Sequence, residues 1–200
     1  EKCIECHRCV QGCPENHVKE KHEPRQCYAA WQKDRKERKY SASGGIAFGF
    51  YKRWIQNAGI VYGAAFNEKG ILTQQKAETL EEIKKFRGSK YAQSHTGFVY
   101  SDIGKELKKG EKVLFIGTPC QIAGLKAYLG KASDALVTID LICHGTPPMS
   151  YLEEYIKEIA GAEKVDRVSF RGEKDYHMVF YSQDRVVYSQ RFRKDLYYTA

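Results

Sequence analysis

The chain has 200 residues, of which 42% are hydrophobic, and its formal net charge is +8. This length and hydrophobic content support a folded domain with a small addition and argue against disorder. We find no apolar run of roughly eighteen residues, so no membrane span is expected. The densest basic run, KDRKERK at 33–39, also contains two acids and is interpreted as a solvated segment. We therefore expect no nucleic-acid partner.

Four cysteines near the start form the strongest chemical pattern. They are Cys3, Cys6, Cys9 and Cys13, with the spacing C-x2-C-x2-C-x3-C-P. This spacing is typical of bacterial-type 4Fe–4S sites. A four-thiolate zinc site is the alternative, although zinc sites normally pair two C-x2-C knuckles across a longer loop. In two-cluster ferredoxins the fourth cysteine binds the other cluster, so Cys13 would need partners from a second motif that this chain lacks. The cysteine usage fits a reducing compartment, and we expect a cytoplasmic protein.

Regular hydrophobic patterns begin only at Gly44, after a polar and charged stretch at 15–43. A helix with Ile46, Phe50 and Trp54 on one face is expected to end at Gly59. The capping box of Thr79 with Glu82 predicts the start of a later helix. Between these two helices we predict a buried strand at 60–66, a turn at 67–70 and a second strand at 71–77.

The middle of the chain alternates helices and strands, which predicts an α/β fold, α+β overall. We expect a mixed, mostly parallel sheet with covering helices, preceded by part of a ferredoxin-like iron–sulfur module. The first predicted elements are a helix through Val99, Ile103 and Leu107 to Gly110, a strand at 112–117 and a helix at 118–130 capped by Thr118. A buried strand at 135–143 and a helix at 150–161 with a Ser150–Glu153 capping box follow. The last predicted elements are three strands at 168–172, 177–182 and 186–190, and the final two form a hairpin.

Two further cysteines come after predicted strands. Cys120, in IGTPCQ, is expected in the first turn of a helix, where free N–H groups and the helix dipole stabilise a thiolate. Cys143, in LICHGTPP, ends the next strand. The carboxyl ends of parallel strands lie on one edge of a sheet, so the two thiols could supply half of a second cluster. For Cys120 the alternative is a buried structural cysteine.

Two small loops are candidates for holding an anionic cofactor. SASGG at 41–45 precedes a predicted helix, and helix N-termini with such loops bind phosphate. RGSKY at 87–91 places Arg87 and Lys90 in a glycine-containing loop. The alternatives are an ordinary capped helix start and two exposed charges. No nucleophile triad or G-x-G-x-x-G pattern is present.

Taken together, YAAWQKD, SASGG, GIVYGAAF, FRGSKYAQS, VLFIGTPCQIAGLKAYL and IDLICHGTPP resemble the coenzyme F-420 hydrogenase/dehydrogenase beta-subunit family, in the branch with an N-terminal ferredoxin-like module. The resemblance implies FAD and 4Fe–4S clusters, with Cys120 and Cys143 as cluster ligands completed by a downstream C-x-x-C pair. A cation near the flavin ring would stabilise its reduced anion, and Lys90 is the candidate. The candidate cofactor-binding residues are Ser43, Gly44, Gly45, Arg87, Lys90 and Thr118.

The expected function is that of an iron–sulfur flavoprotein oxidoreductase or its electron-input subunit. Electrons would pass between clusters and FAD, and so to or from a hydride carrier such as coenzyme F-420 or another substrate. A redox partner protein or ferredoxin-type donor is expected, and no catalytic residue is assigned. The expected parts are the end of a ferredoxin-like module at 1–20, a linker at 21–43 and a flavin-binding domain at 44–200 that continues beyond Ala200. The alternatives are a non-enzymatic electron-transfer module with a degenerate flavin site and a zinc-stabilised binding module.

Overall fold

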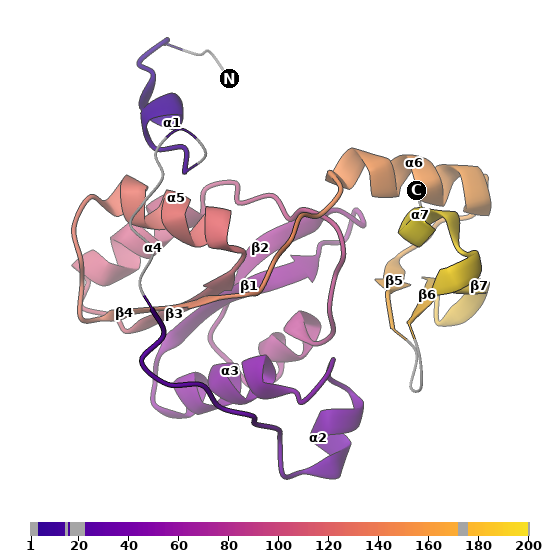
Figure 1. Ribbon diagram of the computed structural model, residues 1–200, viewed down its shortest axis with the longest axis horizontal. Helices are drawn as coiled ribbons and strands as arrows, with labels where there is room; N and C mark the ends of the chain where they lie inside the picture. The colour runs from indigo at the N-terminus through magenta and orange to yellow at the C-terminus, as the bar shows by residue number, and fades with distance from the viewer. Residues whose placement is uncertain (1–3, 15, 17–22, 172–175, 200) are drawn as a thin grey trace.

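The computed structural model describes residues 4–14, 16, 23–171 and 176–199. Figure 1 shows a larger unit around a four-stranded sheet and a smaller unit around a three-stranded sheet. The larger sheet has the order β2-β1-β3-β4, in which β1, β3 and β4 are parallel and β2 pairs antiparallel with β1. These strands are β1 Ile60–Phe66, β2 Leu72–Ala77, β3 Val113–Gly117 and β4 Leu136–Asp140. The predicted mixed, mostly parallel sheet is therefore confirmed.

Helices cover both faces of the larger sheet, because side chains along each strand alternate between its faces. On one face, Val61 and Ala65 of β1 pack with α3 (Ile46–Gln56) and the 3₁₀ helix η1 (Glu82–Phe86). On the other face, Ile60 and Tyr62 pack with α4 (Val99–Lys108) and α5 (Pro119–Leu129). Both layers are visible in Figure 1.

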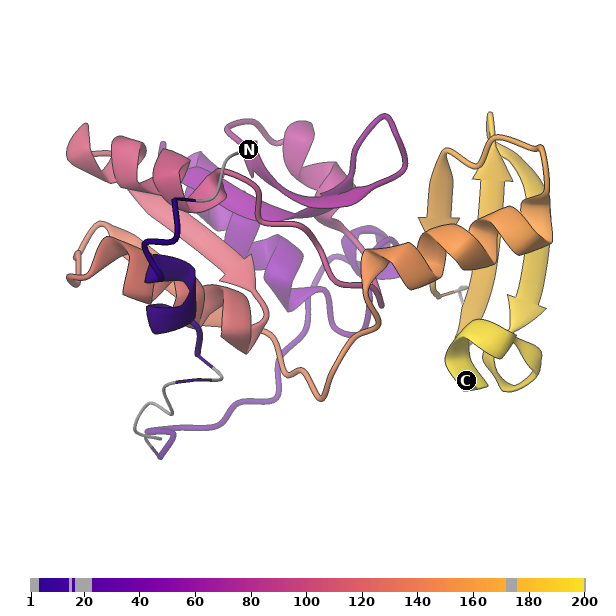
Figure 2. The same ribbon diagram turned by 90° about the horizontal axis from the view of Figure 1, so that it is seen from above.

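The smaller unit is an antiparallel sheet of order β5-β6-β7, made of β5 Arg167–Ser169, β6 His177–Ser182 and β7 Arg185–Arg191. Helices α6 (Met149–Ala160) and α7 (Leu196–Thr199) pack against it, and Figure 2 shows α6 running from the larger unit along this sheet. The core of the smaller unit also includes Leu72 and Ala92 of the larger unit, so the two units share buried apolar contacts. The predicted hairpin between β6 and β7 is confirmed.

Two short helices precede the larger unit. Helix α1 is Arg8–Gln11 and α2 is Arg35–Lys39. The Asp34 side chain caps α2 by accepting hydrogen bonds from the backbone N–H groups of Lys36 and Glu37. In the described part of the chain, every helix is too short or too polar to traverse a bilayer.

Three local predictions were wrong. In α3 the buried residues are Phe48 and Tyr51, whereas Phe50 is 49% exposed. This face is selected because Gly63 of β1 has no side chain and leaves room for the Tyr51 ring. Helix α6 begins at Met149 with Pro148 at the N-cap and no side-chain capping bond, so the predicted Ser150–Glu153 box is absent. Strand β4 ends at Asp140 and is only partly buried, because it is the edge strand of its sheet.

Replacing Gly63 with alanine should destabilise the fold by about 1–3 kcal/mol. An added Cβ would lie 2.9 Å from Tyr51 Cζ and 3.0 Å from Phe86 Cδ2, so two packed rings would have to move. Gly104 in α4 is the control, because its added Cβ would be 3.5 Å from the nearest atom, Leu129 Cδ2. Gly104→Ala should stabilise by about 0.5–1 kcal/mol through helix propensity. Urea unfolding measures the change in unfolding free energy for both variants, and equal changes would contradict the packing argument.

Candidate cofactor site

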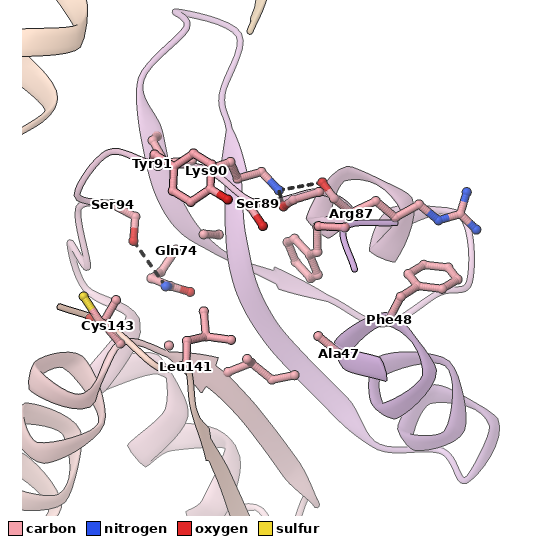
Figure 3. Close-up of a pocket in the computed structure, with 18 of the residues that line it drawn as sticks. Ala47, Phe48, Gln74, Arg87, Ser89, Lys90, Tyr91, Ser94, Leu141 and Cys143 are labelled. Carbon is pink, nitrogen blue, oxygen red and sulfur yellow. Dashed lines mark hydrogen bonds between the residues drawn. The ribbon is translucent and has the colours of Figure 1, made fainter. Parts of the chain in front are cut away.

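A pocket of ≈ 350 Å³ opens at the carboxyl edge of the larger sheet, and we call it the cofactor pocket. Ligands in open α/β sheets bind beyond the carboxyl ends of the strands, so this is the expected place for a cofactor. Figure 3 shows side chains from separate segments converging on it. Its walls come mainly from the loop before α3, the loop after η1, the end of β3 and residues 141–143 after β4.

Five of the six candidate cofactor-binding residues line the cofactor pocket. They are Ser43, Gly45, Arg87, Lys90 and Thr118. Gly44 is not among the lining residues, and its Cα packs against the chain at Ala30 and Trp31. A Cβ added at Gly44 would lie 2.7 Å from Ala30 O, so this glycine allows a close approach of two backbone segments.

Lys90 brings an amino group to the pocket. Its Nζ donates hydrogen bonds to two backbone carbonyls, Arg87 O at 2.9 Å and Gly88 O at 3.2 Å. Both acceptors are neutral, and burial of the amino group lowers the pKa of Lys90 to about 7 even though the residue as a whole is half-buried. A bound anion would therefore favour the protonated, fully charged form of the Lys90 amino group.

Arg87 is already engaged by the protein. Its guanidinium pairs with Glu37 of α2 and lies 3.9 Å from the centroid of the Phe48 ring. Figure 3 shows this guanidinium directed away from Lys90. Arg87 therefore connects α2 to the pocket wall, and Glu37 largely balances its charge.

Sequence reasoning missed Arg171, which comes from the smaller unit. Its Nη1 donates to Ser43 Oγ at 3.2 Å and its Nε donates to Tyr91 Oη at 3.0 Å. Ser43 and Tyr91 both line the cofactor pocket, so Arg171 ties the smaller unit to the pocket rim. No local sequence pattern predicts this contact, because Ser43 and Arg171 are 128 positions apart.

A buried polar network forms another wall of the pocket, and sequence reasoning missed it as well. Gln121 of α5 donates from Nε2 to Ser94 O at 3.0 Å and to Ser94 Oγ at 2.9 Å. Gln74 of β2 donates from Nε2 to Gln121 Oε1 at 3.1 Å. Gln74 Oε1 is buried and has no hydrogen-bond partner in the described part of the chain.

Cys120 lies in the first turn of its helix as predicted, whereas Cys143 lies three residues beyond its strand instead of ending it. Strands β3 and β4 pair in parallel, Cys120 is in the first turn of α5, and Cys143 follows β4. Both residues are exposed, so the alternative of a buried structural cysteine at Cys120 is wrong. Cys143 lines the cofactor pocket, whereas Cys120 lines two neighbouring cavities. Among the described residues, no three histidine, cysteine or acidic side chains gather closely enough to hold a metal.

The N-terminal cysteines are only partly described. Cys3 lies outside the described residues, and the same is true of the Cys9 side chain. Cys6 is exposed and Cys13 is half-buried. Cys13 and Cys120 line one cavity of ≈ 1350 Å³ beside α4 and α5, so the N-terminal segment and the α5 thiol face a common space.

The structure defines an α/β domain with a pocket at the carboxyl edge of its larger sheet and with exposed thiols near that pocket. Residues 110–195 match the family described as the C terminus of the coenzyme F420 hydrogenase/dehydrogenase beta subunit.

A solved structure gives a second comparison. The chain is similar to one in the xenon-derivatised F420-reducing [NiFe] hydrogenase complex from Methanosarcina barkeri, with a TM-score of 0.54 and 18% identity. The match covers 82% of this chain and 59% of that chain, so this chain spans under two thirds of its relative's length. At this identity the similarity establishes the fold alone. A comparison with curated proteins finds no match.

Proposed function

We propose that this chain is an iron–sulfur flavoprotein redox subunit that binds FAD in the cofactor pocket. The observation that carries the proposal is convergence: loops before α3, after η1 and after β3 and β4 meet in one pocket. That pocket contains a lysine with a lowered pKa and a buried acceptor without a donor among the described residues. Both features suit a ligand that brings negative charge and an N–H group.

Particular residues have particular tasks in this proposal. The Ser43–Gly45 loop and Lys90 would hold the anionic part of the cofactor near the start of α3. Leu72, Ile116 and Leu141 would supply apolar surface for the flavin ring. When bound, FAD interconverts two-electron hydride transfer and single-electron transfer.

Cys120 and Cys143 are proposed as ligands of an iron–sulfur cluster whose other ligands are not among the described residues. Their exposure at one sheet edge supports this assignment. We propose the N-terminal cysteine run as a further cluster site within a ferredoxin-like part at 1–20, linked through 21–43 to the flavin domain at 44–200. The partners would be a cytoplasmic electron donor and a hydride carrier such as coenzyme F-420 or another substrate.

Titration of the flavin-free protein with FAD tests the proposal. We expect saturation at about one FAD per chain, with quenched flavin fluorescence and shifted visible absorption bands. Absence of binding at micromolar FAD would contradict it. An anaerobic spectrum separates the alternatives: a cluster without flavin would indicate an electron-transfer module, and a colourless zinc-containing protein would indicate a binding module.

A further inference from the structure

The orientation of the Gln74 carboxamide is fixed by its neighbours. Gln121 must direct its NH₂ group at Ser94, because a backbone carbonyl at 3.0 Å can only accept. The other atom of that amide, Gln121 Oε1, accepts from the Thr118 backbone N–H at 3.2 Å. Gln74 approaches this oxygen at 3.1 Å and must therefore present its own NH₂ group. Gln74 Oε1 consequently points the other way.

This leaves one buried acceptor without a hydrogen-bond partner among the described residues, on a side chain that lines the cofactor pocket. Gln74 is 6% exposed, and its Oε1 is without a partner within the described residues. Figure 3 shows the amide nitrogen on the side of Ser94 and the oxygen turned into the pocket. A buried acceptor left without a donor is unfavourable, so a ligand that supplies an N–H at this point gains affinity.

We propose that Gln74 Oε1 accepts a hydrogen bond from the imide N–H of the flavin ring and thereby determines how the ring is oriented. This inference rests on the proposed function. An imide edge suits the site because it carries its N–H within a flat ring, which fits between apolar residues such as Ile116 and Leu141. Gln121 and Ser94 act as positioning residues, since they hold the Gln74 amide in one orientation.

The first arm of the test changes only the ligand. FAD and FAD methylated at the imide nitrogen are titrated into the unaltered protein, which avoids any folding question. Because methylation removes the donor, we expect the methylated ligand to bind about tenfold more weakly. Equal affinity for the two ligands would overturn the inference and leave the proposed function standing. Failure of both to bind would overturn the inference and the proposed function together.

The second arm changes the protein. Gln74→Met keeps the side-chain length but removes the acceptor, and should weaken the binding of unmethylated FAD about tenfold. In this variant, methylation should change affinity by less than about threefold, since the bond is already absent. Unchanged affinity of Gln74→Met for FAD would mean that the amide only fills space, and would overturn the inference.

Gln75→Met is the matched control, because Gln75 is the next residue of β2 and is not among the residues that line the cofactor pocket. Its Nε2 donates to Ala65 O at 3.1 Å and to Thr73 Oγ1 at 3.0 Å. The variant should bind FAD as the unaltered protein does and keep the discrimination against the methylated ligand. If it lost both to the same extent as Gln74→Met, disruption of β2 would explain the results and the inference would fail.

Discussion

Replacing Lys90 with methionine is expected to weaken FAD binding at about pH 6.5 by tenfold or more and to remove most of its pH dependence. In the free protein the pKa of Lys90 is about 7, because burial disfavours the charged amine. A bound anion would stabilise the charged form, so FAD binding should take up a proton near neutral pH. Affinity should therefore fall as the pH rises above 7. Calorimetry in two buffers of different ionisation enthalpy measures the proton uptake directly.

Lys84→Met is the control for this experiment. Lys84 is exposed, belongs to the neighbouring η1 segment and pairs with Glu81. Its loss changes the net charge by the same amount but removes no pocket contact, so both affinity and pH dependence should stay close to those of the unaltered protein. A Lys90→Met variant that bound FAD with unchanged affinity and an unchanged pH profile would exclude a role for this lysine in holding the ligand.

Although Lys90→Met should weaken FAD binding, it should increase the free energy of unfolding of the ligand-free protein. The folded-state pKa of Lys90 is about 7 and its ordinary value is 10.5, so the unfolded chain holds the additional proton between these two values. The destabilising effect of Lys90 is therefore complete below about pH 7 and disappears as the pH rises through about 10.5. Lys90→Met should be more stable than the unaltered protein at pH 6.5, with the difference vanishing near pH 10.5. A variant that was less stable at pH 6.5 would contradict this account.

The elements that the sequence predicted well are those determined by nearby residues. Helix α5 begins after Thr118, has Pro119 as its first residue and ends at Gly130, as expected. Thr118 and Gln121 form its capping box, and Gly130 adopts the left-handed conformation at the C-cap. Each of these signals acts over a few residues, so one sequence is sufficient to recognise it.

The features that the sequence did not predict depend on residues brought together by the fold. The buried face of α3 is selected by Gly63, which lies on a strand after the helix. Arg171 reaches Ser43 from the other unit, and Gln74 finds Gln121 across 47 positions. Such contacts follow from strand pairing and unit packing, which periodicity does not encode. For the same reason, the sequence could offer the loops at 41–45 and 87–91 only as separate candidates, whereas the convergence of five candidate residues on one pocket emerged from the structure.

Replacing Cys120 or Cys143 with alanine in the intact protein should remove about four iron atoms per chain if both thiols bind one 4Fe–4S cluster. Each substitution would delete a thiolate ligand, and any iron bound by the N-terminal cysteine run should be kept in both variants. Iron analysis and low-temperature electron paramagnetic resonance of the reduced protein measure the loss. Cys27→Ala is the control, because Cys27 is also exposed but lies outside the sheet edge. Unchanged iron content in Cys120→Ala and Cys143→Ala would exclude the ligand assignment.

The two cysteines should also differ from each other in a way that the pocket predicts. Cys143 lines the cofactor pocket, whereas Cys120 lies in the first turn of α5 and is not among the lining residues. In protein freed of iron, where cluster loss cannot contribute, losing the Cys143 side chain should therefore change the fluorescence and absorption of added FAD, while losing that of Cys120 should change them much less. Flavin spectra of both iron-free variants that equal those of the iron-free unaltered protein would indicate that Cys143 is remote from the bound ring. The combined iron and flavin measurements thus test separately whether this sheet edge holds a cluster and whether Cys143 lies beside the flavin.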